Sequence, residues 1–459
     1  MIPLCHAPRL DRYRACLLAG AIGDALGAPV EFLTRREILR DFGPGGVRDH
    51  SASYGRVAAI TDDTQMTLFT AEGLLRAERF AGAVASRADG ARMTGEPPAA
   101  LAAREAHVEA VAHSYLQWLL TQRERPAEHG GYDGLLGVAA LHSRRAPGHT
   151  CLAALERLAA APALAGSLRA TNGSKGCGGV MRVAPAGLFC ARLSGNDADA
   201  ARAAFALGSD LAAITHGHPG GYLPGGVLAA MVTLLARDVP KTRALACARQ
   251  ILVTCPEHGD TLQAINAAER LAALGSANHD AMVQLGGGWI GDEALAMALY
   301  CTLAAESLES AVLVAVNHSG DSDSTAAIAG NLLGAERGMA AMDDTGSKAI
   351  DTAELARVFT LRGTGEPVTV TAPAIPSVLE QARQADELVA VLRERVRGLE
   401  EQRELYRQQL QAAQSAMEVL TLRLPPPAAA SQSAGSGLIW AVLGLVFAVA
   451  MGVAVVVVR

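Results

Sequence analysis

Aromatic residues are scarce in this sequence: they make up 4% of its 459 residues, although half of the chain is hydrophobic. Strands favour aromatic and β-branched side chains, whereas alanine and leucine are strong helix formers. Alanine is very common here, and no long run alternates polar and apolar residues. The composition therefore predicts an all-α fold.

The chain also lacks a strong net charge and any cysteine pair spaced as Cys-X-X-Cys. A net charge of −6 argues against a basic stripe for nucleic acid, so we expect no nucleic-acid partner. The eight cysteines are scattered, mostly in apolar, helix-like surroundings. We expect reduced, buried thiols, which suit a reducing compartment.

Changes in composition divide the chain into five segments. Residues 1–363 are predicted to form one globular helical region, in which helices alternate with breaks rich in glycine, proline and polar residues. Residues 364–376 contain three prolines and are expected to form a linker. Residues 377–424 change to Gln, Glu, Arg and Leu. A second linker of Pro, Ala, Ser and Gly (425–437) leads to an uncharged apolar run at 438–458.

One part of the globular region is expected to be irregular. Residues 81–110 are rich in alanine and carry the sequence TGEPP in the middle. Glycine and proline interrupt regular structure, so we expect this stretch to form a surface loop between helices.

The segment 377–424 fits a heptad repeat, which predicts a coiled coil and a homo-oligomer. A solitary amphipathic helix lying on the globular region is the alternative. Arg403 and Ala413 weaken the seam, so we expect a modest self-association at most. The a positions are Val389, Val396, Arg403, Leu410, Met417 and Leu424, and the d positions are Leu392, Leu399, Tyr406, Ala413 and Leu420.

The run from Leu438 to Val458 holds 21 residues without a charge. At about 1.5 Å per residue such a helix spans roughly 30 Å, the thickness of one bilayer core. A buried core helix is the alternative. The N-terminus lacks the basic start, apolar core and cleavage site of a signal peptide. We therefore expect a single-pass, tail-anchored membrane protein with its large N-terminal region in the cytoplasm.

Two predicted helices begin with several oxygen-bearing side chains in a row. Such residues cap helices, because they accept hydrogen bonds from free amides and their charge suits the helix dipole. One cap per helix is enough, however, and adjacent carboxylates repel each other unless a cation neutralises them. The first group is Thr61, Asp62, Asp63 and Thr64, and the second is Asp321, Ser322, Asp323, Ser324 and Thr325.

Together, the two groups would supply four carboxylates and several hydroxyls. These are hard oxygen ligands, which suit Mg²⁺, Mn²⁺ or Ca²⁺ rather than zinc. Four shared carboxylates can hold two metals about 3.5–4 Å apart. A site of this kind can chelate an adjacent diol or polarise a water. The pattern therefore favours a binuclear metal site over capping alone.

Two further segments carry weaker signals. Residues 172–188, NGSKGCGGVMRVAPAGL, are rich in glycine at their start, and such turns let backbone amides approach phosphates. A plain turn is the alternative. His216 and His218 precede another predicted helix, where histidines are more often structural.

The N-terminal stretch LAGAIGDALGAPVEF (18–32) places Gly20, Gly23 and Gly27 at helical spacing. Small residues on one helix face predict close packing against a second helix. Asp24 and Glu31 are the functional candidates of this stretch.

Six segments in this order resemble the ADP-ribosylglycohydrolase family: GDALGAPVEF, TDDTQMTL, NGSKGCGGVMR, THGHPGGYL, GGGWIGDEALAMAL and NHSGDSDSTAAIAGNLLGA. The nearest branch is that of the ADP-ribosylarginine hydrolases and the dinitrogenase reductase-activating glycohydrolases. The resemblance covers about residues 10 to 345. The predicted coiled coil and membrane helix lie outside it.

The resemblance implies a compact all-α catalytic domain at residues 1–363 with two Mg²⁺ ions, or Mn²⁺ in some members. It implies hydrolysis of the N- or O-glycosidic bond between ADP-ribose and a protein side chain, with arginine favoured here. Reversal of mono-ADP-ribosylation at a membrane follows as the expected function. Hydrolysis of serine-linked or O-acetyl-ADP-ribose is one alternative. An inactive fold serving as a membrane-anchored binding or structural protein is the other.

The resemblance also implies roles for individual residues. Asp62 and Asp63 are the catalytic candidates, since either could orient or deprotonate the attacking water. Ser324 stands where many members carry threonine. The implied metal ligands are Thr61, Asp62, Asp63, Asp321, Asp323 and Ser324. The implied substrate-binding residues are Glu31, Lys175, Gly176, Cys177, Gly178, Gly179 and His216.

Overall fold

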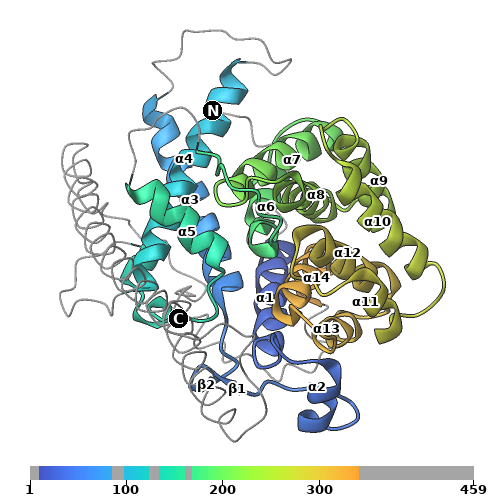
Figure 1. Ribbon diagram of the computed structural model, residues 1–459. Helices are drawn as coiled ribbons and strands as arrows, with labels where there is room; N and C mark the ends of the chain where they lie inside the picture. The colour runs from blue at the N-terminus through green and yellow to red at the C-terminus, as the bar shows by residue number, and fades with distance from the viewer. Residues whose placement is uncertain (1–9, 85–97, 124–133, 161–167, 341–459) are drawn as a thin grey trace, which may run out of the picture. The chain divides into compact units, whose positions relative to one another are not determined.

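The computed structural model describes four stretches of the chain: residues 10–84, 98–123, 134–160 and 168–340 (Figure 1). The predicted linkers, coiled coil and membrane helix lie outside them. The described part is predominantly helical, as the composition predicted. Its α-helices are α1 (Leu10–Gly27), α2 (Arg35–Phe42), α3 (Asp62–Val84), α4 (Pro98–Thr121), α5 (His149–Ala160), α6 (Ala184–Ala191), α7 (Asp197–Ala213), α8 (Pro219–Ala236), α9 (Lys241–Leu252), α10 (Gly259–Ala272), α11 (His279–Leu285), α12 (Gly291–Ala304), α13 (Leu308–Val316) and α14 (Ser322–Arg337).

Short elements fill the connections between these helices. The strands β1 (Ala52–Ser53) and β2 (Arg56–Val57) pair antiparallel in a small hairpin. Three 3₁₀ turns, η1 (Gly134–Gly137), η2 (Ala139–Leu141) and η3 (Cys177–Gly179), lie in loops. The turn η3 belongs to the glycine-rich segment.

The expectation of a loop over residues 81–110 is wrong where the structure describes them. Helix α3 continues to Val84, and α4 begins at Pro98. Alanine is the strongest helix former, and proline is tolerated in the first turn of a helix. The alanine-rich flanks therefore join the helices, and residues 85–97 lie outside the described residues.

The first and last described helices, α1 and α14, pack closely against each other (Figure 1). A Cβ atom added at Gly23 would lie 2.2 Å from the carbonyl oxygen of Ala326, and one at Gly27 would lie 2.4 Å from Cα of Asp323. Gly330 meets the Ala19 carbonyl oxygen in the same way, at 2.2 Å. The glycine stripe is therefore a helix-packing surface, as predicted, and it brings the end of α1 against the acidic start of α14.

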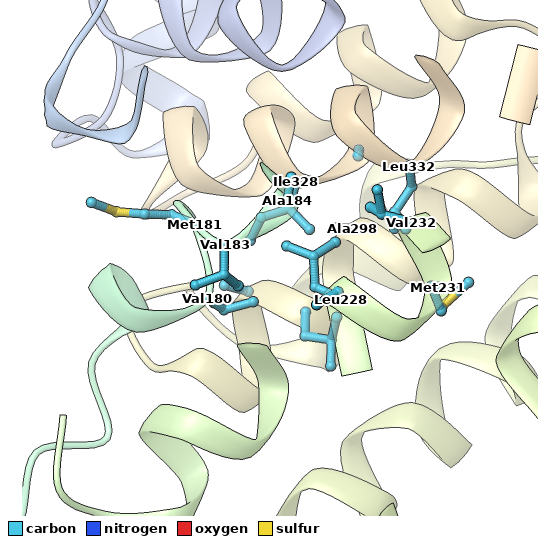
Figure 2. Close-up of a cluster of buried hydrophobic side chains, with 14 of the residues drawn as sticks. Val180, Met181, Val183, Ala184, Leu228, Met231, Val232, Ala298, Ile328 and Leu332 are labelled. Carbon is cyan, nitrogen blue, oxygen red and sulfur yellow. The ribbon is translucent and has the colours of Figure 1, made fainter. Parts of the chain in front are cut away.

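Helix α8 lies in the core, where α6, α12 and α14 surround it with aliphatic side chains. Figure 2 shows Leu228 and Val232 of α8 in one buried cluster with residues of the other three helices. Among the described residues, α8 is the one helix long and apolar enough to cross a membrane, yet 89% of it is buried in the protein. It is thus the core helix of this domain.

The cysteines of the described residues are free thiols. Cys16, Cys151, Cys190 and Cys301 are buried, as predicted. Cys177, Cys247 and Cys255 are only partly buried, so the expectation of buried thiols is wrong for these three. Cys177 belongs to the glycine-rich segment, and its contact with Asp321 at the start of α14 makes it part of the candidate site.

Candidate functional site

The start of α3 is capped by a carboxylate from another helix. Asp24 of α1 accepts hydrogen bonds from the backbone amides of Thr61, at 2.9 Å, and Thr64, at 3.0 Å. The two threonine hydroxyls donate to the same carboxylate, at 2.8 and 2.5 Å. The Asp62 amide donates to the Arg145 carbonyl and the Asp63 amide to Thr61 Oγ1. Because these amides already have acceptors, α3 does not need the carboxylates of Asp62 and Asp63 as caps.

Asp62 and Asp63 occupy the first turn of α3 and are nearly buried, with 4% and 3% of their surface exposed. The Asp62 carboxylate accepts one hydrogen bond, from the Gly148 amide at 3.2 Å. Asp63 Oδ1 is buried and has no hydrogen-bond partner within the described residues. A buried carboxylate oxygen without a partner is costly, so this group is placed for something other than folding.

The start of α14 holds the second group. Asp321 is the N-cap residue: its side chain accepts from the Ser324 amide at 3.3 Å. The same carboxylate accepts from Sγ of Cys177 at 2.8 Å. Asp323 accepts from the Ser324 amide at 2.9 Å and is 2% exposed. Both carboxylates thus accept from the Ser324 amide, although one acceptor would be enough to cap it.

Both groups lie against α1: Asp24 bonds Thr61 and Thr64, and Gly27 packs against Asp323. The pKa of Asp323 is raised well above its usual range, by burial and by the charges of Glu31, Asp63 and Asp321. Burial and the nearby charges of Asp62, Asp24 and Asp321 raise the pKa of Asp63 likewise. Such repulsion falls off with distance, so these carboxyls are close neighbours. We call them the acidic cluster; its members are Asp24, Glu31, Asp62, Asp63, Asp321 and Asp323.

Glu31 lies at the loop end of α1 and is 8% exposed. Burial, together with the charges of Asp321 and Asp62, raises its pKa to about 9. Its Oε2 is a second buried oxygen without a hydrogen-bond partner in the described part of the chain. The acidic cluster therefore cannot ionise fully near neutral pH unless a cation compensates it.

The donor set fits hard divalent cations. It consists of carboxylate and hydroxyl oxygens, the ligands that Mg²⁺ and Mn²⁺ prefer. Two of the carboxylate oxygens are buried without a partner in the part of the chain that the structure describes. Across the four described stretches, no three His, Cys, Asp or Glu side chains are already arranged as a metal-ligand group. Coordination would therefore require side chains of the acidic cluster to rotate inward.

The glycine-rich segment lies against the acidic cluster. The Cys177 amide donates to the Trp289 carbonyl at 3.2 Å, and the Gly291 amide donates to the Lys175 carbonyl at 2.8 Å. The Gly176 amide donates to Ser174 Oγ at 3.2 Å. Two amides predicted to face phosphates are thus already bonded within the protein, while the Cys177 thiol connects the segment to Asp321.

The remaining members of the predicted substrate set lie around this segment. Lys175 extends away from the acidic cluster to Asp260 of α10, with 2.8 Å between Nζ and Oδ2. Cβ atoms added at Gly176 and Gly178 would lie 3.1 Å from the ring of His216, and one at Gly179 would lie 2.5 Å from a backbone oxygen. Close packing over His216 therefore accounts for these glycines.

His216 is buried beneath the glycines, and its Nδ1 lies 2.8 Å from Thr215 Oγ1. Burial and the charge of Arg182 lower its pKa to about 3, so the imidazole is neutral at physiological pH. His218 caps α8, since its ring accepts from the Gly220 amide at 3.0 Å. His218 thus has the structural role of a helix cap, and His216 packs against the glycine-rich segment.

Comparison with known proteins gives the family. The family model of ADP-ribosylglycohydrolases matches residues 6–367. The chain belongs to the ADP-ribosylglycohydrolase family. The resemblance found in the six segments is thereby confirmed, and this family supports a hydrolase of the ADP-ribosylglycohydrolase type.

Individual relatives of this ADP-ribosylglycohydrolase are distant. The uncharacterized protein YegU of Escherichia coli (strain K12) is 36% identical over 76 residues, which cover 15% of this chain and 23% of that protein. The chain thus matches less than a quarter of that relative's length. A solved structure described as an ADP-ribosylglycohydrolase-related protein complex aligns with a TM-score of 0.49 and 23% identity, over 76% of this chain and 97% of the other.

Three features of the site in this ADP-ribosylglycohydrolase were not predicted from its sequence. Asp24 was a candidate without an assigned role, because its capping of α3 depends on a contact far along the chain. Arg182 is fully buried and bonds Thr215 Oγ1 at 2.7 Å, beside His216. The rings of Phe32 and Trp289 stack, although each lies in one of the six segments used for the resemblance.

Proposed function

We propose that this chain is a metal-dependent hydrolase that cleaves the glycosidic bond between ADP-ribose and a protein side chain, with arginine as the favoured linkage. The observation that carries the proposal is the acidic cluster. Helices α1, α3 and α14, with the residues next to the end of α1 and the start of α14, contribute six buried, mutually repelling carboxyls. Two of their oxygens lack partners within the described residues. Folding alone gives no reason to retain such a cluster.

The residues that would hold the metals are the hydroxyls of Thr61 and Ser324 with the carboxylates of Asp62, Asp63, Asp321 and Asp323. Bound Mg²⁺ or Mn²⁺ would supply Lewis acidity and fix the hydroxyl pair of the distal ribose. The protein's own groups would do the rest. Asp62 and Asp63 are the candidates to orient a water and accept its proton. Carboxylates around the anomeric carbon would favour an oxocarbenium-like transition state.

Release of free ADP-ribose tests this function. The full-length chain, kept in detergent, is assayed on ADP-ribosylarginine with Mg²⁺, with Mn²⁺ and with chelator. We expect metal-dependent release that Asp323→Ala abolishes. Asp41→Ala, which removes an exposed carboxylate outside the acidic cluster, is the control and should change nothing. Release from ADP-ribosylserine alone would move the linkage to serine, and metal binding without release from either would favour an inactive, ligand-binding fold.

We further propose that the chain acts at a membrane, anchored by residues 438–458, with residues 377–424 associating as a coiled coil. Support comes from the uncharged run and the heptad pattern. Deletion of residues 438–459 should release the protein into the soluble fraction and leave hydrolysis of a soluble substrate unchanged. A deleted protein that stays with membranes would contradict the anchor.

A further inference from the structure

Two exposed aromatic rings stack beside the acidic cluster. Phe32 and Trp289 have ring centroids 5.7 Å apart and planes inclined by 20°. Phe32 is 68% exposed and Trp289 is 44% exposed. Large aromatic side chains gain most of their free energy from burial, so an exposed stacked pair is unusual in a chain with 4% aromatic residues.

Each ring lies in a loop segment next to a member of the acidic cluster. Phe32 directly follows Glu31 of the cluster. Trp289 follows Gly288, whose Cβ position lies 3.2 Å from the Cβ of Asp321. The Trp289 carbonyl also accepts from the Cys177 amide. The pair therefore joins the turn after α1 to the loop before α12, and each of these segments borders the acidic cluster.

The loop of Trp289 is fixed before any ligand binds. Glu293 accepts hydrogen bonds from the amides of Gly287 and Gly288, at 3.0 and 3.1 Å. The Asp321 amide donates to the Gly287 carbonyl at 2.8 Å. We call the Phe32–Trp289 pair the aromatic platform. Because hydrogen bonds already hold the loop of Trp289, this platform loses little conformational entropy when a ligand binds to it.

A third aromatic residue lies near the same place. Tyr54 sits in the turn between β1 and β2 with a positive φ of 49° and is 41% exposed. Burial and the charges of Glu31 and Asp323 raise the pKa of its phenol. The turn of the hairpin therefore comes within electrostatic range of the acidic cluster.

We propose that the Phe32–Trp289 pair binds the guanidinium group of the target arginine and so selects arginine-linked ADP-ribose. A guanidinium is planar and cationic, stacks on aromatic faces, and is attracted to the neighbouring carboxylates. The hydroxyl of a serine acceptor has neither the plane nor the charge. This inference rests on the proposed function and names its leaving group.

The test compares two ligands on the full-length chain in Mg²⁺. Agmatine carries a guanidinium and an ammonium, whereas cadaverine carries two ammonium groups and has no planar cation. We measure how strongly each amine inhibits the release of ADP-ribose from ADP-ribosylarginine, and we measure ADP-ribose binding by calorimetry. We expect agmatine to inhibit more strongly than cadaverine in the unaltered chain.

Variants test whether the aromatic platform itself, and not a change in the fold, determines agmatine inhibition. Trp289→Ala should weaken agmatine inhibition by about threefold to tenfold, whereas Trp289→Phe, which keeps a ring, should retain most of it. ADP-ribose affinity should not change in either. Leu274→Ala removes another exposed hydrophobic side chain, 83% exposed, and is the matched control. Its agmatine inhibition should equal that of the unaltered chain.

Three results would overturn the inference. Unchanged agmatine inhibition in Trp289→Ala, with ADP-ribose binding intact, would reject the aromatic platform as the guanidinium site and leave the proposed function standing. A parallel loss of ADP-ribose affinity would mean that the rings stack on the adenine instead. If the unaltered chain binds no ADP-ribose, the proposed function itself fails, and this inference fails with it.

Discussion

Asp24 stabilises the start of α3 although it belongs to α1, and its removal tests that role. Asp24→Ala would leave the buried amides of Thr61 and Thr64 without an acceptor, at a cost of about 1–3 kcal/mol for each. We expect a lower urea midpoint and weaker Mg²⁺ binding, because the first turn of α3 carries Asp62 and Asp63. Asp41→Ala serves as the surface control. A variant as stable as the unaltered chain would show that Asp24 does not hold this turn.

Asp63 illustrates a conflict between stability and function within one residue. Its Oδ1 is buried without a partner in the described residues, and its charge meets several like charges. Asp63→Asn removes the charge, so we expect the metal-free protein to gain about 0.5–2 kcal/mol at pH 8. The same variant should lose the stabilisation that Mg²⁺ gives. Chemical denaturation with and without Mg²⁺ measures both, and a metal-free loss of stability would contradict the repulsion argument.

At the scale of helices, the α1–α14 contact positions the second acidic group. Gly23→Ala would place a methyl group 2.2 Å from the Ala326 backbone oxygen, which has no side-chain freedom to move. Overpacking of this kind costs about 1–3 kcal/mol, more than the roughly 1 kcal/mol that alanine gains in helix propensity. We expect a lower melting temperature. Gly259→Ala, at an α10 position with nothing within 4 Å of its Cβ, should be neutral or stabilising.

The helices also show which features a sequence can predict. Local signals were sufficient for the acidic helix starts, the glycine stripe and the all-α composition, because each depends on neighbouring residues. The loop expected at 81–110 is wrong at its two described ends, because strong helix formers on both sides of TGEPP continue the helices. The Asp24 cap and the Phe32–Trp289 stack could not be predicted, since each joins segments that only the folded chain brings together.

At the scale of the whole molecule, the acidic cluster links stability, pH and metal. An acid whose pKa is raised by folding holds more protons in the folded state than in the unfolded state, so the free energy of unfolding falls as pH rises. For Glu31, the pH interval in which stability is lost runs from its ordinary pKa of 4.5 to its raised pKa of about 9. The raised pKa values of Asp62, Asp63 and Asp323 act in the same direction.

The metal-free protein should therefore melt at progressively lower temperature between pH 5 and pH 9. Mg²⁺ binds the deprotonated carboxylates, so its stabilising effect should grow over the same interval and its binding should release protons. Melting temperatures of the full-length chain at several pH values, with chelator or with Mg²⁺, measure the difference in stability between the metal-free and the Mg²⁺-bound protein. Asp63→Asn should make the metal-free profile shallower. A metal-free melting temperature that rises with pH would mean that the carboxyls do not share one buried site, and the metal-dependent function would lose its main support.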